Sequence, residues 1–175
     1  MRAMTPRWRK VALTVHVAAS VGWLGAVAAF LALAVAGLAG EDAQTVRAGY
    51  VAMELIGWYV IVPLCAASLV TGVVSSLGTT WGLVRYYWVV VKLAITVLAT
   101  LALLVHMQPV DHIADVAAGA AWSGGELHGL RVQLVIQSGA AVLALLVATG
   151  LSVYKPQGLT RRGQRARAGA RAAAA

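Results

Sequence analysis

The chain has 175 residues, enough for one domain, of which 61% are hydrophobic and 11% charged; its mean hydropathy of +0.81 excludes an ordinary soluble protein. Its one cysteine, Cys65, excludes a disulfide framework and a CxxC redox or zinc motif. The net charge of +8 would suggest a nucleic-acid partner for a soluble protein, but the basic residues crowd both termini and the loop 78–85. All six acidic residues lie in or beside the other two connections: Glu41, Asp42, Glu54, Asp111, Asp115 and Glu126. This is the positive-inside pattern of an integral membrane protein, and we expect no nucleic-acid partner.

Four apolar runs are each long enough to cross a bilayer, which takes about 20 residues. The first follows a basic N-terminal segment, residues 1–10, that we expect in the cytoplasm. In the second, Pro63 lacks a backbone donor and predicts a kink. The runs cover about 11–37, 50–77, 84–106 and 130–154.

The connections complete an all-α membrane fold, an antiparallel bundle of four transmembrane helices over residues 11–156 with both termini cytoplasmic. The longest predicted connection is 108–129, whose middle, His112 to Trp122, is expected as a short amphipathic helix on the outer surface. The tail, 157–175, carries five arginines and no acid. It is predicted to be disordered, cytoplasmic and attracted to anionic lipid headgroups.

Lys92 is the one full charge in the apolar run 88–106. A charge near the bilayer centre costs about 3 kcal/mol, usually faces protein or water, and often marks function. At 1.5 Å per residue, His16 lies about 8 Å and Lys92 about 12 Å from the cytoplasmic face. His16 shares a helix face with Trp23, so these two residues and Lys92 are expected to bound an inner-leaflet pocket with ligand-binding or redox chemistry. The plainer alternative is that His16 bonds a neighbouring helix and Lys92 reaches to the interface.

A second polar layer is predicted toward the outer face. Glu54 lies about one turn inside the second run, and Arg131 is close to it in depth. Gln137 lies in the same layer of the fourth run. The pattern predicts an ion pair that joins the two helices, with a proton-handling carboxylate as the alternative.

Three histidines cluster near the predicted outer rim: His106, His112 and His128. Imidazole suits copper and haem iron, so these residues and His16 are the candidate metal ligands. His106 ends the third run and His128 precedes the fourth, so the two are expected to face each other at one depth and clasp a b-type haem. Solvated loop histidines are the alternative.

The pattern H-x6-W-x-G that begins at His16, and W-x3-K-L, whose lysine is Lys92 and whose run ends in His106, resemble a known superfamily. It comprises small bacterial four-helix membrane proteins, including the copper-resistance D proteins and the HemJ-type protoporphyrinogen oxidase. A closer likeness, over about residues 6–156, is to an uncharacterised actinobacterial group of integral membrane proteins, of which HVAASVGWLGA and LSVYKP are typical. The resemblance implies a bacterial plasma membrane and places the oxidase's functional residues, associated with haem binding and porphyrinogen oxidation, on His16 and Lys92.

Three hypotheses follow. The first is a haem-binding or redox-associated, porphyrin-related protein with catalytic His16 and Lys92. His16 would be the axial ligand, Lys92 a second ligand or the cation for a propionate, and Trp23, His106 and His128 further cofactor-binding residues. The second is a non-catalytic module that binds copper or a partner protein through the outer histidine-rich loop. The third is a helical scaffold without a cofactor. Whether the protein is an enzyme stays open, and a homo-oligomer or a redox partner is compatible with each.

Overall fold

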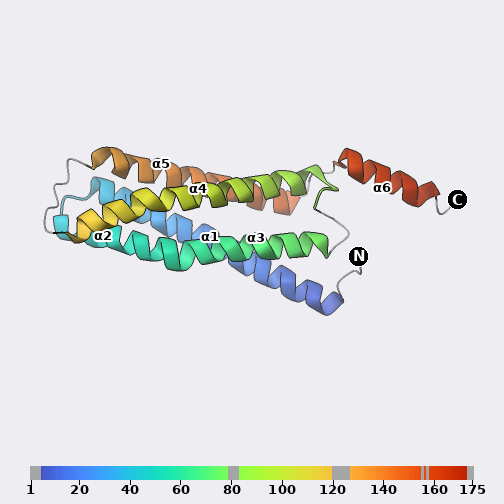
Figure 1. The fold of residues 1–175 in the computed structure, drawn as a ribbon, viewed down its shortest axis with the longest axis horizontal. Coiled ribbons are helices and arrows are strands. Elements are labelled where there is room, and N and C mark those ends of the chain that lie inside the picture. Colours follow the sequence, from blue (N-terminus) through green and yellow to red (C-terminus); the bar gives the residue numbers. More distant parts are fainter. Residues whose placement is uncertain (1–4, 79–82, 120–126, 155, 157, 173–175) are drawn as a thin grey trace.

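The computed structural model describes residues 5–78, 83–119, 127–154, 156 and 158–172. Over these residues the chain is all-helical and contains no strand. Four helical spans are long and apolar enough to cross a membrane (Figure 1). They are Pro6–Ala39, Ala43–Leu77, Tyr87–Ala118 and His128–Tyr154. The prediction of a four-span membrane protein is therefore confirmed at the level of its helices.

The first span is one helix, α1 (Pro6–Ala39). It begins five residues before the predicted run because Pro6 occupies the first turn, where a missing backbone N–H costs nothing. Its buried residues recur every three or four positions, so they form one stripe that faces the other spans. They are Ala19, Trp23, Val27, Phe30, Ala34 and Gly37.

The second span has three parts: α2 (Ala43–Ile56), the π-helical turn η1 (Gly57–Ile61) and α3 (Val62–Leu77). The second run was predicted to begin at about residue 50, but α2 begins at Ala43, because Asp42 caps it by accepting a bond of 2.8 Å from the Thr45 amide. The π-helical turn ends two residues before Pro63, the residue that predicts a kink. Such turns occur where the regular backbone ladder is interrupted.

The third span, α4 (Tyr87–Ala118), corrects the predicted connection 108–129. The helix continues through Pro109 for nine more residues, so residues 112–118 belong to the span and do not form a separate surface helix. The remainder of that predicted helix, 120–122, lies outside the described residues. The physical reason is packing. Val110, Ile113 and Ala117 lie on one face of α4 and are buried, and α4 packs against α2. The free energy gained by this burial offsets the hydrogen bond lost at Pro109.

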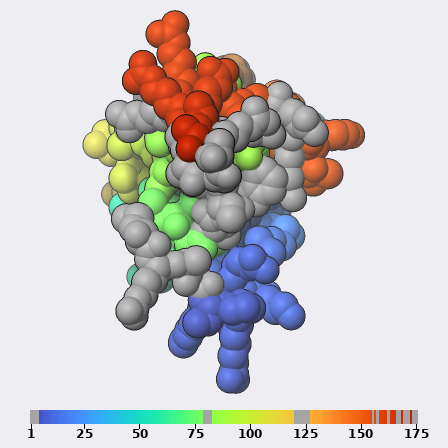
Figure 2. Space-filling model, turned by 90° about the vertical axis from the view of Figure 1, so that its right-hand side faces the viewer, coloured from blue at the N-terminus to red at the C-terminus, as the bar shows by residue number. Residues whose placement is uncertain are grey.

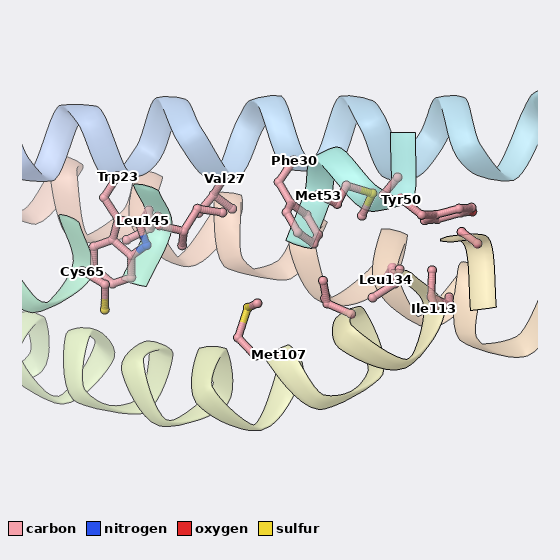
Figure 3. Close-up of a cluster of buried hydrophobic side chains, with 14 of the residues drawn as sticks. Trp23, Val27, Phe30, Tyr50, Met53, Cys65, Met107, Ile113, Leu134 and Leu145 are labelled. Atoms are coloured by element: carbon pink, nitrogen blue, oxygen red, sulfur yellow. The ribbon is translucent and has the colours of Figure 1, made fainter. Parts of the chain in front are cut away.

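The fourth span, α5 (His128–Tyr154), closes a ring of four. α1 packs against α2, α3 and α5, and α4 packs against the same three helices. All four spans contribute to one apolar core (Figure 3). Both chain termini lie at the same end of the bundle, here called the terminal end (Figure 1). The opposite end is called the far end.

The tail differs from the predicted disordered segment, because residues Arg161–Ala172 form helix α6. Figure 2 looks onto the terminal end, where α6 and the start of α1 lie on opposite sides. Hydrogen bonds attach the segment before α6 to the start of α4. The Tyr87 amide donates to the Gly158 carbonyl at 3.1 Å, and the Thr160 amide donates to the Arg85 carbonyl at 3.0 Å. These bonds hold the tail at the terminal end. They could not be predicted from the charge composition of the tail.

Candidate functional site

The structure brings His16 of α1 and Lys92 of α4 together in the bundle interior. The Lys92 Nζ lies 3.3 Å from the His16 Nε2, although the two residues are 76 positions apart in the chain. Both side chains are half-buried. The two side chains therefore lie in one layer of the bundle, as their depths along the helices predicted.

α3 holds the imidazole of His16 in one orientation. Its Nδ1 lies 3.1 Å from the Ser68 carbonyl oxygen and 3.2 Å from the Thr71 hydroxyl oxygen. The Thr71 hydroxyl donates its own hydrogen to the Ala67 carbonyl at 2.5 Å, so its oxygen is left to accept. Nδ1 is then the protonated nitrogen, and the lone pair of Nε2 faces the ammonium of Lys92.

Small residues let α1 and α3 approach closely at this point. A Cβ on Gly72 would lie 3.1 Å from the His16 Cε1, so glycine leaves the space that the ring occupies. One turn deeper, the Ser20 and Ser68 hydroxyls are 2.8 Å apart. These contacts fix the ring relative to α3 from both sides.

Lys92 has no acidic partner within the described part of the chain. Its hydrogen-bond partner there is the neutral imidazole of His16. The described acidic residues lie before α2, in α2 or in the last three turns of α4, all toward the far end: Glu41, Asp42, Glu54, Asp111 and Asp115. The site thus presents an uncompensated positive charge beside an oriented lone pair, which favours an anionic or metal-containing ligand.

Trp23, the third residue predicted for the pocket, lies deeper than the pair. It is buried in the apolar core, and Figure 3 shows its ring beside Cys65 and Leu145. Besides Lys92, the groups that contact the His16 ring come from α3. Sequence reasoning missed Ser68 and Thr71, whose spacing with Ser75 (i, i+3 and i+7) is the signal of a polar stripe in an otherwise apolar helix.

The predicted second polar layer is also present, with other partners. Arg131 is buried, and it donates to the Tyr50 hydroxyl at 2.9 Å and to the Gly37 carbonyl. Gln137 accepts from His106 Nδ1. An ion pair of Arg131 with Glu54 stays a prediction. The contacts found join α5 to α1, α2 and α4.

The predicted haem clasp between His106 and His128 is wrong in its geometry. Because α4 does not end at His106, this residue lies level with Gln137, about 13 Å along α5 from His128. The rings of His106 and Phe30 are in contact, with centroids 5.8 Å apart. His112 and His128 are exposed. Within the ranges described, no three His, Cys, Asp or Glu side chains form a group that could hold a metal.

Fold and site together define an all-helical protein with four candidate membrane spans and a half-buried His–Lys pair in the bundle interior. The chain matches no protein-family model, no curated protein and no solved structure.

Proposed function

We propose that the chain is a multi-pass protein of the bacterial plasma membrane, an antiparallel bundle with both termini in the cytoplasm. In support, the first two spans pair His16 with Ser68 and Gly37 with Tyr50, so residue numbers rise along one span as they fall along the other. The described arginines of α6 and the basic start of α1 lie at the terminal end, which the positive-inside rule assigns to the cytoplasm.

We further propose that His16 and Lys92 form a haem-binding, redox-associated centre. The observation that carries this proposal is the orientation of the His16 ring. Histidines that bind metal almost always donate their other ring N–H to an oxygen, often a backbone carbonyl. In this chain Nδ1 is held by the Ser68 carbonyl, and the lone pair of Nε2 is directed into the interior. The residues therefore fit an axial-ligand role.

Lys92 fits the complementary role of binding an acidic group. Nε2 has one lone pair, so a metal bound there would replace the hydrogen bond from Lys92. The ammonium would then be free to bind a carboxylate such as a haem propionate. Haem in this position would supply one-electron redox chemistry. The protein's own contribution would be the ligand nitrogen, its orientation and the cation. The resemblance to the HemJ-type oxidase supports the same two residues.

The absorption spectrum of protein purified in mild detergent from haem-replete cells tests this proposal. We expect a Soret band for the wild type, its loss in His16→Ala, and its weakening in Lys92→Ala. Two matched controls, His112→Ala and Lys10→Ala, replace exposed residues of the same types and should leave the band unchanged. Gel filtration must show the same monodisperse protein for all variants. A colourless wild type, or a band that His16→Ala leaves intact, would overturn the proposal.

A further inference from the structure

Two stripes of polar side chains lie in the terminal half of the bundle interior. α3 contributes a stripe at i, i+3 and i+7 that leads from His16 toward the terminal end. α4 contributes a second stripe at i, i+4 and i+8. The two stripes consist of Ser68, Thr71 and Ser75, and of Lys92, Thr96 and Thr100.

Two side chains of this half, Lys92 and Ser75, have hydrogen-bonding capacity that the described residues do not use. The Lys92 ammonium has three N–H donors, and those residues offer it one acceptor, His16 Nε2. The Ser75 hydroxyl oxygen is buried without a hydrogen-bond partner. A buried unsatisfied polar group costs about 1–3 kcal/mol, and more if it is charged. Water makes up such deficits where two to four polar groups lie close together.

The far half of the interior holds mainly apolar side chains, and its buried charge is paired: Arg131 donates to the Tyr50 hydroxyl and to the Gly37 carbonyl. The largest side chains of this half are less than 2% exposed, and most are apolar: Tyr50, Met53, Met107, Val110, Ile113 and Leu134. Packing there is close, since a Cβ on Gly57 would lie 2.6 Å from the Met107 Cε. His106 Nε2 is also buried without a partner, but the Nδ1 of the same ring is bonded to Gln137 and Phe30 lies against the ring. The far half is therefore expected to exclude water.

We infer that the terminal half of the interior holds a water-filled vestibule, which hydrates Lys92 and opens to the aqueous phase at the terminal end. The α3 stripe lines it, and the close-packed far half closes it. Protons and small polar solutes then reach the His16–Lys92 pair from the terminal side only. The inference concerns the same pair as the proposed haem centre but does not require the cofactor.

Single-cysteine labelling tests the vestibule in membrane vesicles of both orientations. Cys65→Ser removes the chain's one cysteine, and Ser75→Cys, Ser68→Cys or Leu134→Cys is then added. The probe is a charged, membrane-impermeant maleimide. We expect Ser75→Cys and Ser68→Cys to react from the terminal side at least about tenfold faster than Leu134→Cys, because the reactive thiolate forms in water and not in an apolar core.

Two exposed positions calibrate the sides: Arg165→Cys should react from the terminal side and Glu41→Cys from the far side. Thermal unfolding must show that each variant is folded. Labelling of Ser75→Cys no faster than that of Leu134→Cys would overturn the vestibule, and so would faster labelling from the far side. Since labelling needs no haem, a colourless protein with a reactive Ser75→Cys would refute the haem centre and leave the vestibule standing.

Discussion

Replacing Gly37 by alanine is expected to destabilise the bundle at the contact of α1 with Tyr50. A Cβ at this position would lie 2.7 Å from both Cζ and Oη of Tyr50. The ring has little room to move, because it is 1% exposed and its hydroxyl accepts from Arg131 at 2.9 Å. The added methyl group therefore displaces Tyr50 and weakens its bond to Arg131.

The magnitude follows from three terms. Overpacking a close-packed core costs about 1–3 kcal/mol, and losing a hydrogen bond to a charged group costs about 1.5–3 kcal/mol. Alanine in a helix is favoured over glycine by about 1 kcal/mol. The losses outweigh the gain, so we expect Gly37→Ala to lower the free energy of unfolding by about 3 kcal/mol.

Equilibrium unfolding in mixed detergent micelles measures this change, with Gly25→Ala as the matched control on the same helix. A Cβ on Gly25 would meet no atom within 4 Å, so that variant should be neutral or slightly more stable. If Gly37→Ala proved as stable as Gly25→Ala, the close packing assigned to this end of α1 would be refuted.

Three further outcomes are expected. Arg47→Ala should lower the melting temperature, because the guanidinium donates to three carbonyls at the end of α4, at 2.5, 3.4 and 2.6 Å; an unchanged melting temperature would count against this clamp. Hydrogen bonds from Thr45 lower the pKa of Asp42 in the folded chain. The carboxylate therefore stabilises α2 at pH values above the pKa of Asp42 in the unfolded chain, and this stabilisation is lost as the pH falls through the lowered pKa of the folded chain. Asp42→Ala should therefore reduce thermal stability at neutral pH and make it less sensitive to acid, and an acid dependence equal to that of the wild type would refute the cap. Gly72→Ala should push the His16 ring and weaken the proposed Soret band without unfolding the protein, whereas an intact band would show that the ring tolerates displacement.

Much of the fold and the central pair could be predicted from sequence because both depend on periodicity and depth. Hydrophobic runs define the spans, and a rise of 1.5 Å per residue is enough to put His16 and Lys92 in one layer. A charge in an apolar run must find a polar partner, which makes such a residue informative even without tertiary structure.

The errors arise where tertiary contacts override local signals. The third apolar run was predicted to end at His106, yet buried contacts with α2 carry α4 through Pro109 to Ala118, and the shift in depth separates His106 from His128. Ser68 and Thr71 were missed because hydroxyl groups are common in membrane helices. Their importance lies in which way they face, and that depends on how α3 packs against α1.

The central claim is that His16 and Lys92 face each other inside the bundle, and proximity cross-linking tests it most directly. In the Cys65→Ser background, His16→Cys is combined with Lys92→Cys or, as a control, with Leu98→Cys, whose position on α4 is 65% exposed. A short bis-methanethiosulfonate should cross-link the first pair within one chain, detected by intact mass, and not the second. Equal cross-linking of both pairs, or of neither, would contradict the account.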